Sequence, residues 1–246
     1  MRRNWTKPEV RLALALYLRL EFGKFHKGNR EVKALAAVVD RTPSAVALKL
    51  GNLAALDDSL PQGGMSNASA TDRIVWQEFL QTPETIIDAS LPVHLNTSGF
   101  GFADNATAWK SRTGNDVSAP TTARRGQQFF RDMILTGYQN RCALTEVNDP
   151  RLLNASHIVG WADAPKLRLN PTNGLCLNTL HDRAFDRHLI TFDEDYQMQV
   201  ASDVPWDARK SLEKVDSRRL TMPTRFLPNQ TFLEQHRRRF YNRLLE

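Results

Sequence analysis

The chain of 246 residues contains only two cysteines, and neither has a neighbour at the spacing of a metal-binding pair. Without a CxxC pair, Cys142 and Cys176 do not support a structural zinc site. Each lies in a short apolar run, so we expect two buried, free thiols. A chain of this length can bury a large core without disulfides. The sequence therefore predicts neither a disulfide framework nor a structural zinc ion.

Long apolar stretches are also missing. No segment approaches the ~18 consecutive apolar residues that would indicate a transmembrane helix. The first residues are basic and lack the apolar core of a secretory signal, and the apolar run from Leu12 to Leu20 is interrupted by Arg19. No internal repeat is visible. We therefore expect a cytoplasmic protein with no membrane partner.

Negative charge is scarce at both ends of the chain. Lys and Arg number 33 against 27 Asp and Glu, a net charge of +6. Residues 1–60 hold eleven basic and six acidic side chains, residues 61–123 three and six, and residues 124–246 nineteen and fifteen. Basic ends favour a polyanionic partner such as nucleic acid, although most basic runs are only solvated faces. Net charge alone therefore does not identify the partner, and specific residues are needed.

Four polar residues in one short region suggest a reaction centre. His157 ends an apolar run, and Asn173 follows sixteen residues later, beyond a turn that contains Pro171. Asp182 and Asp186 come next, and their i, i+4 spacing places both carboxylates on one face of a helix. This order predicts a β-turn-β-α unit whose polar side chains converge on one spot.

These residue types suit the hydrolysis of a phosphodiester. That reaction needs a base to activate water and a divalent cation to neutralise the phosphate. His157 is the candidate base, because imidazole titrates near neutral pH. The Asn173 amide can hold the base or the strand beneath it, or offer an oxygen to a metal. Two carboxylates, those of Asp182 and Asp186, suit a hard cation such as Mg²⁺ or Mn²⁺.

The same region resembles the HNH endonuclease family, in its restriction-enzyme-like branch. The resemblance begins near Arg125, passes through Cys142 and the His157 unit, and extends to the carboxy-terminal residues, so that it covers roughly half of the chain. It implies a ββα-metal fold in which His157 is the catalytic base and Asn173 is the central asparagine.

The resemblance also implies a set of metal ligands. Asp182 and Asp186 match the helix ligand positions by spacing, His181 lies one residue off, and Ser156 stands where many members have Asp or His. A hydroxyl is a weaker ligand than a carboxylate. Phe185 is apolar and should face the core, so the carboxylate stripe can face the strand that carries the base. We expect Asp182 as the primary ligand, Asp186 as the second, and His181 as a substitute ligand or a phosphate contact.

Residues 1–60 predict three short helices. Thr6 can cap the first, residues 31–39 form the second, and Thr42 or Ser44 caps the third. Two helices joined by a tight turn resemble a helix-turn-helix or a Myb/SANT-type module. The candidate DNA contacts in this unit are Arg41, Ser44 and Lys49. A three-helix cap that only packs against the rest of the chain would have a similar sequence.

The patterns divide the chain into three parts. Residues 1–90 should form a helical domain with a further helix over 71–90, residues 91–123 a linker or long loop, and residues 124–246 the nuclease domain. Beyond the central unit, the nuclease domain should contain a helix at 127–137, short strands at 189–192 and 197–201, and a helix at 231–245. The predicted fold class is α+β, with a carboxy-terminal ββα-metal domain and an amino-terminal helical domain.

The leading interpretation is a metal-dependent endonuclease of restriction type that cleaves double-stranded DNA, with a requirement for a modified base as a sub-hypothesis. Arg168, Arg183 and Arg187 are candidate phosphate contacts, although Arg183 or Arg187 could instead pair with Asp186. Two other functions stay open: a DNA-binding regulator with an idle HNH-like domain, and a nonspecific nuclease for DNA or RNA. A single ββα-metal site cuts one strand per event, so double-strand cleavage would favour a homodimer.

Overall fold

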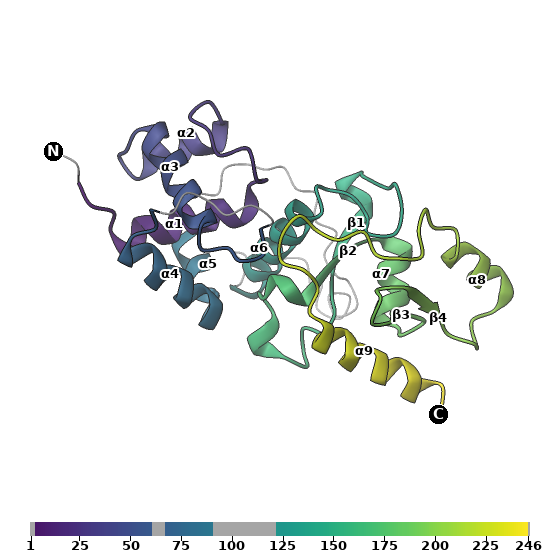
Figure 1. Ribbon diagram of the computed structural model, residues 1–246. Helices are drawn as coiled ribbons and strands as arrows, with labels where there is room; N and C mark the ends of the chain where they lie inside the picture. Colours follow the sequence, from purple (N-terminus) through teal and green to yellow (C-terminus); the bar gives the residue numbers. More distant parts are fainter. Residues whose placement is uncertain (1–2, 61–66, 91–121, 246) are drawn as a thin grey trace, which may run out of the picture.

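A computed structural model describes residues 3–60, 67–90 and 122–245 of the chain. The linker predicted over residues 91–123 lies outside the described residues, apart from its last two positions. In Figure 1 the amino-terminal helices occupy one end of the molecule and a mixed helix and strand region occupies the other, with α6 (Thr122–Gly137) between them. The fold class is α+β, as the sequence predicts.

The amino-terminal half is helical throughout its described elements, and side chains cap most of the helix starts. Its helices are α1 (Lys7–Arg19), α2 (Arg30–Val38), α3 (Pro43–Ala54), α4 (Ala70–Gln81) and α5 (Glu84–Ser90). Thr6 and Glu9 form a capping box at α1, in which each side chain accepts from the other residue's backbone N–H. Thr42, rather than Ser44, caps α3 by accepting from Ala45 N.

Helix α1 forms the centre of this half and packs against α3, α4 and α5. Its residues from Glu9 to Leu18 are buried except for Arg11 and Leu12, which are partly exposed. The single helix predicted over residues 71–90 is instead two helices, α4 and α5. The break falls at Pro83, because proline lacks the N–H and clashes with the preceding turn of a continuous helix.

The carboxy-terminal half contains two small antiparallel hairpins and four helices in its described residues. Its elements after α6 are β1 (Leu153–His157), β2 (Gly174–Asn178), α7 (Thr179–Asp186), β3 (Ile190–Phe192), β4 (Met198–Val200), α8 (Trp206–Leu212) and α9 (Gln230–Arg243), with short 3-10 turns at Pro150–Leu152, Pro165–Leu167 and Pro171–Asn173. Both α6 and α7 pack against the β1–β2 hairpin, and α9 packs against β3. Helix α8 is an element that the sequence patterns do not predict.

The two halves share one hydrophobic core. Arg225, in the segment before α9, is buried and donates hydrogen bonds to Tyr17 O (2.9 Å) and Leu18 O (2.7 Å) in the last turn of α1. The Thr136 hydroxyl of α6 donates to Arg19 O (3.0 Å). The carboxyl end of α1 is therefore held by side chains from the other half of the chain.

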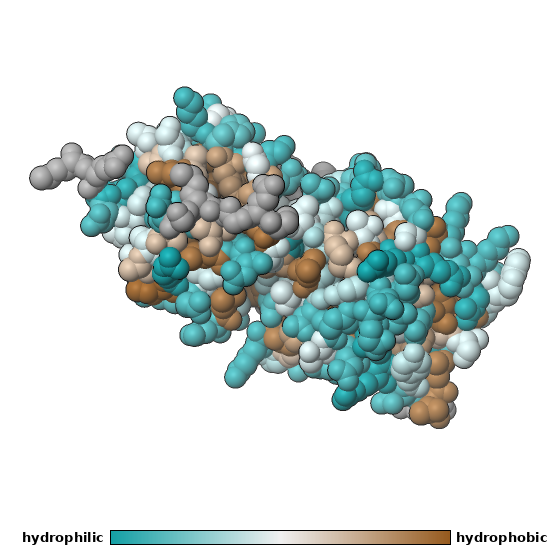
Figure 2. Space-filling model, in the orientation of Figure 1, coloured by the Kyte–Doolittle hydropathy of each residue, from teal (hydrophilic) through white to brown (hydrophobic). Residues whose placement is uncertain are grey.

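One face of the carboxy-terminal half is predominantly polar. Figure 2 shows hydrophilic residues covering most of the visible face there, with scattered apolar residues toward the amino-terminal helices. Among the described helices, none has the length and apolar character that crossing a membrane requires. Cys142 and Cys176 are both buried and free, as expected.

Candidate active site

The β1–β2 hairpin and helix α7 form the frame of the candidate site. The antiparallel register pairs His157 with Gly174, so Asn173 directly precedes the strand residue that faces His157. Helix α7 starts immediately after β2, where the Asn178 side chain caps it by accepting from His181 N (3.0 Å). This is the predicted strand–turn–strand–helix order, and it places α7 against β1.

The carboxylate of Asp182 points from α7 to one face of β1. Its Oδ2 accepts a hydrogen bond from Asn154 Nδ2 (2.6 Å), and its Oδ1 accepts one from the Ser156 hydroxyl. Asn154 and Ser156 are two residues apart, so they share a face of the strand. Ser156 is buried, whereas Asn154 and Asp182 are half-buried. The expectation that Asp182 faces the strand carrying His157 therefore agrees with these contacts.

His157 projects from the opposite face of β1, toward α6. Its imidazole stacks on the Phe130 ring with centroids 3.9 Å apart and planes at 13°, and the Trp161 ring meets it edge-on at 5.5 Å. His157 Nε2 lies 3.0 Å from Arg168 O. Gly174, opposite His157, leaves room for this packing, since a Cβ there would lie 2.7 Å from Phe130 Cζ.

These contacts determine the chemical state of the imidazole. A carbonyl oxygen only accepts hydrogen bonds, so Nε2 carries the proton and Nδ1 carries the lone pair. Among the described residues no hydrogen bond occupies Nδ1. Burial is the main influence on the pKa of His157 and lowers it from the ordinary value; the bond to Arg168 O opposes this shift. His157 is therefore a neutral imidazole at neutral pH, the form that accepts a proton.

Asn173 holds the loop that follows His157. Its Oδ1 accepts from Val159 N (2.8 Å), and its Nδ2 donates to Val159 O (3.1 Å) and Leu167 O (3.2 Å). The side chain is fully buried. Of the roles considered for Asn173, these contacts match that of holding the strand end beneath the base, because its oxygen and its amide nitrogen both bond to backbone groups of the following loop.

Comparison with known protein families finds a family that matches this region. The family model described as HNH endonuclease matches residues 142–193, which include β1, β2, α7 and β3. Residues 142–193 are an HNH endonuclease domain. The match covers about a fifth of the chain, less than the half that the resemblance suggested, and leaves out α6 and the carboxy-terminal helix. No match is found among curated proteins.

Within the HNH domain, His181 lies away from the Asp182 group. It is buried, with Nε2 donating to Leu212 O (2.9 Å) and Nδ1 close to Asn178 Oδ1 (3.1 Å). The expectation that His181 ligates metal or contacts phosphate does not agree with this placement. Because successive residues of a helix are 100° apart, directing Asp182 to β1 turns His181 toward α8.

Asp186 ends α7 of the HNH domain and is exposed. Within the described residues, the side chains of Asn154 and Ser156 bond to Asp182 and not to Asp186. In the part of the chain that the structure describes, no three His, Cys, Asp or Glu side chains gather there as a ready-made metal site. A cation in the HNH domain would therefore depend on Asp182 together with neutral oxygen donors.

The arginines predicted to contact DNA near the HNH domain differ in their surroundings. Arg183 on α7 and Arg187, which directly follows α7, are both exposed, and neither guanidinium makes an ion pair with another described residue. Arg168 is half-buried; its Nε donates to Trp161 O (2.8 Å), and its guanidinium lies over the Trp161 ring. Arg168 thus shapes the loop around His157, and Arg183 and Arg187 are better placed for phosphate.

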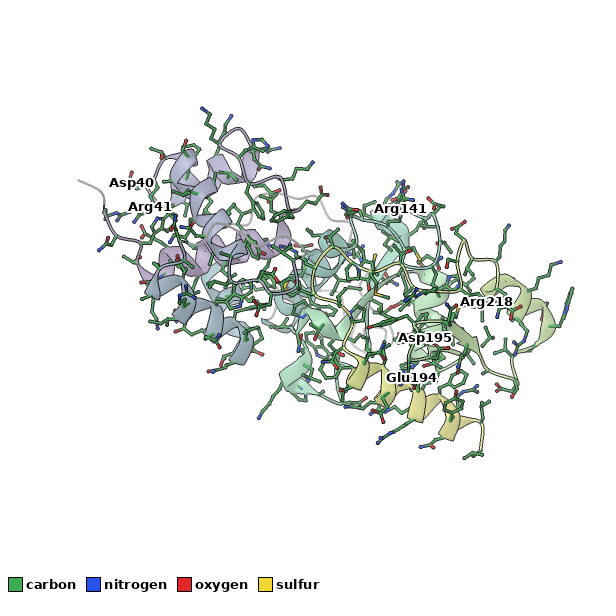
Figure 3. The ribbon with its side chains drawn as sticks, in the orientation of Figure 1. Asp40, Arg41, Arg141, Glu194, Asp195 and Arg218 are labelled. Carbon is green, nitrogen blue, oxygen red and sulfur yellow. The ribbon has the colours of Figure 1, made fainter. Side chains whose placement is uncertain are left out.

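Of the three DNA contacts predicted in the helical half, Arg41 and Lys49 have side chains engaged within the fold. Arg41 donates to Glu9 Oε2 (3.0 Å) and Arg3 O (3.0 Å) and lies over the Trp5 ring, 4.2 Å from its centroid. Figure 3 shows Arg41 at the end of the helical half away from the HNH domain. Its side chain is engaged in holding the chain start against α1.

Lys49 is the second of these engaged side chains. It is buried, and its Nζ donates to both carboxylate oxygens of Asp72, at 2.7 and 2.8 Å. A buried and paired ammonium is not accessible to a phosphate. Ser44 is exposed on α3 and stays a candidate contact.

Sequence reasoning missed three residues that shape the site. Asn154 could have been found from the two-residue period of a strand, since it shares a face with Ser156. Phe130 gave no such signal, because only the tertiary packing of α6 brings it onto His157. Arg131, on the same helix, donates to Leu153 O (2.7 Å) and ties α6 to the start of β1.

Proposed function

We propose that the chain is a divalent-metal-dependent endonuclease that cleaves double-stranded DNA, with His157 as the general base. One observation carries the proposal. At the end of β1, a neutral imidazole whose Nδ1 bonds to no described residue directly follows Ser156, which holds the Asp182 carboxylate. Hydrolysis of a phosphodiester needs a base and a group that can hold a cation, and here both lie at the end of β1, on its two faces.

In the proposed reaction, His157 Nδ1 takes a proton from the water that attacks the scissile phosphorus. The Nε2–H stays on Arg168 O and stabilises the imidazolium that forms. Stacking on Phe130 keeps the ring in one orientation, and Asn173 keeps the following loop in place. The base therefore acts from a prearranged position.

The donor set fits a hard divalent cation, most simply Mg²⁺, with Mn²⁺ as an alternative. Asp182 supplies a carboxylate and Ser156 a hydroxyl, and Mg²⁺ is commonly held by one or two carboxylates, several waters and a substrate phosphate. When bound, such a cation neutralises charge on the phosphate and the leaving oxygen. Asp182 would be the main ligand, Ser156 a weak one, and the exposed Asp186 at most a distant contributor.

Double-stranded DNA is the proposed substrate because exposed cations flank the site. Arg183 lies on the same helix as Asp182 and Arg187 directly follows that helix, so both can contact phosphates near the site. A restriction-type role, including a modification-dependent one, is supported only by the resemblance and by the additional helical half. Cleavage of both strands would require a homodimer or two successive events.

A nicking assay on supercoiled plasmid with Mg²⁺ tests the proposal. His157→Ala should reduce the rate by about 10²–10⁴-fold, the usual cost of losing general-base catalysis, and leave the unfolding midpoint nearly unchanged. His26→Ala, at an exposed loop histidine, is the matched control and should cut at the normal rate. Near-normal nicking by His157→Ala would sink the assignment of the base.

The same assay separates the other two functions. A chain that binds DNA but does not nick it with Mg²⁺ or Mn²⁺ would be a regulator with an idle HNH domain. Equal cleavage of an RNA substrate run in parallel would indicate a nonspecific nuclease.

A further inference from the structure

Asn154 is the side chain closest to the Asp182 carboxylate that has no assigned role. Its Nδ2 donates to Asp182 Oδ2 at 2.6 Å, while the Ser156 hydroxyl donates to the other oxygen. Each oxygen of this carboxylate therefore accepts a hydrogen bond from a residue on the same face of β1. Asn154 is half-buried, so solvent and a ligand can reach this end of the group.

We propose that Asn154 binds the same divalent cation as Asp182 and Ser156, an inference that rests on the proposed metal dependence. Mg²⁺ and Ca²⁺ accept amide carbonyl oxygens as well as carboxylates and hydroxyls. The Asn154 amide carries an oxygen beside the nitrogen that now donates to Asp182. Asn154, Ser156 and Asp182 then form one oxygen donor group across β1 and α7.

The three side chains of this group carry a single formal negative charge, which limits their affinity for a divalent cation. A second carboxylate would strengthen the attraction for a divalent ion, because the affinity of oxygen sites rises with the number of charged ligands. The native group should therefore hold a cation weakly by itself and more firmly once a DNA phosphate adds charge. The residue at position 154 then controls how far cation binding depends on the substrate.

The test uses the full chain without DNA, so that it does not depend on cleavage. Asn154→Asp places two carboxylates together, and in EDTA it should lower the unfolding temperature through like-charge repulsion. Mg²⁺ should restore that temperature, and Mn²⁺ binding followed by electron paramagnetic resonance should become roughly tenfold tighter. Asn148→Asp, at an exposed loop asparagine, is the control with the same charge change and should show neither effect.

A charge swap makes the test independent of added charge. Asp182→Asn should abolish Mn²⁺ binding, and the double variant Asn154→Asp with Asp182→Asn should regain much of it. If Mg²⁺ leaves Asn154→Asp destabilised, or if the swap does not regain binding, Asn154 only supports Asp182 and the inference is wrong. Should Asn154→Asp fail to fold, Asn154→Ala decides: weaker Mn²⁺ binding supports the inference, and unchanged binding overturns it.

The experiments on Asn154 and the nicking assay can fail independently of each other. Tighter Mn²⁺ binding by Asn154→Asp in a protein whose wild type cuts no DNA would support the cation group and refute the nuclease. If the wild type nicks DNA normally but the variants at position 154 bind Mn²⁺ as the wild type does, the nuclease is supported and the role of Asn154 is refuted.

Discussion

The orientation of His157 depends on neighbours that take no part in proton transfer. Phe130 stacks on the imidazole, the Arg168 carbonyl holds its Nε2–H, and Gly174 provides the space beneath it. A base of this kind is useful only when its lone pair points at the water. Changes at Gly174 should therefore affect catalysis although glycine has no functional group.

Gly174→Ala should lower both stability and activity. The new Cβ would lie 2.7 Å from Phe130 Cζ and still closer to Ile134, so both buried side chains must move. Overpacking of this kind costs about 1–3 kcal/mol, and displacement of Phe130 should reduce the nicking rate as well. Urea unfolding and the plasmid assay measure the two effects.

The double variant Gly174→Ala with Ile134→Val is the control, because valine removes the closest methyl group. It should regain part of the lost stability. If Gly174→Ala alone is as stable and active as the wild type, the packing of α6 on the hairpin does not position the base.

Buried polar contacts join the secondary-structure elements of both halves. Lys49 on α3 pairs with Asp72 on α4, and the same carboxylate accepts from Ser69 N (2.9 Å) at the start of α4. On the other side of the molecule, His236 of α9 contacts β3 and α7. These contacts serve packing rather than recognition, although the residues involved are charged or titratable.

Lys49→Ala should destabilise the protein by about 3–5 kcal/mol, because it leaves the buried Asp72 carboxylate without its partner. Its effect on DNA affinity, measured on folded protein, should be small. Ser44→Ala, at an exposed position of α3, should leave stability unchanged and serves as the comparison. A Lys49→Ala protein of normal stability with weakened DNA binding would restore Lys49 as a DNA contact.

His236 should make stability depend on pH. Its Nε2 donates to Phe185 O (3.0 Å), its Nδ1 accepts from the Thr191 hydroxyl (2.9 Å), and the ring stacks on Phe185. Burial, with a smaller contribution from His188, lowers the pKa of His236 to about 3.

In the unfolded chain the pKa returns to about 6.5. Between these two values the unfolded state binds more protons than the folded state, so stability is complete above pH ~6.5 and falls as pH decreases toward about 3, by up to ~1.4 kcal/mol per pH unit. Urea unfolding at several pH values measures this slope. The slope measures how many protons the chain takes up on unfolding, and this number should be about one lower in His236→Gln. An unchanged slope would mean that His236 does not titrate on unfolding.

At the scale of the whole molecule, the amino-terminal half and the carboxy-terminal half depend on each other for their stability. The Arg225 guanidinium donates to three carbonyl groups at the end of α1, those of Tyr17, Leu18 and Leu20. Tyr17 O also accepts from Leu20 N (3.4 Å), but the last carbonyls of a helix lack i+4 donors, and the buried guanidinium supplies them with hydrogen bonds. The sequence predicts a DNA-binding domain and a separate nuclease domain. In the structure the two parts share an extensive hydrophobic core.

Arg225→Ala should cost about 3 kcal/mol or more, because the buried carbonyl groups of Leu18 and Leu20 lose this donor and that of Tyr17 loses one of its two. Calorimetry should show one transition for the wild type and a broadened or divided one for the variant. A fragment that begins near Ser118 should be strongly destabilised, since it exposes Phe129 and the rest of the contact with α1. A fragment as stable as the full chain would show that the halves fold independently.

The sequence by itself determined the elements whose signals are local: the capped helices, the hairpin that carries His157 and Asn173, and the direction of Asp182 from α7. Each depends on residues a few positions apart, whose geometry the backbone imposes. Only the tertiary structure decided the partners of Arg41, Lys49, His181 and Arg225. A basic side chain is identical in sequence whether it faces DNA or fills a buried site, and that choice depends on which distant carboxylate or carbonyl the fold brings beside it.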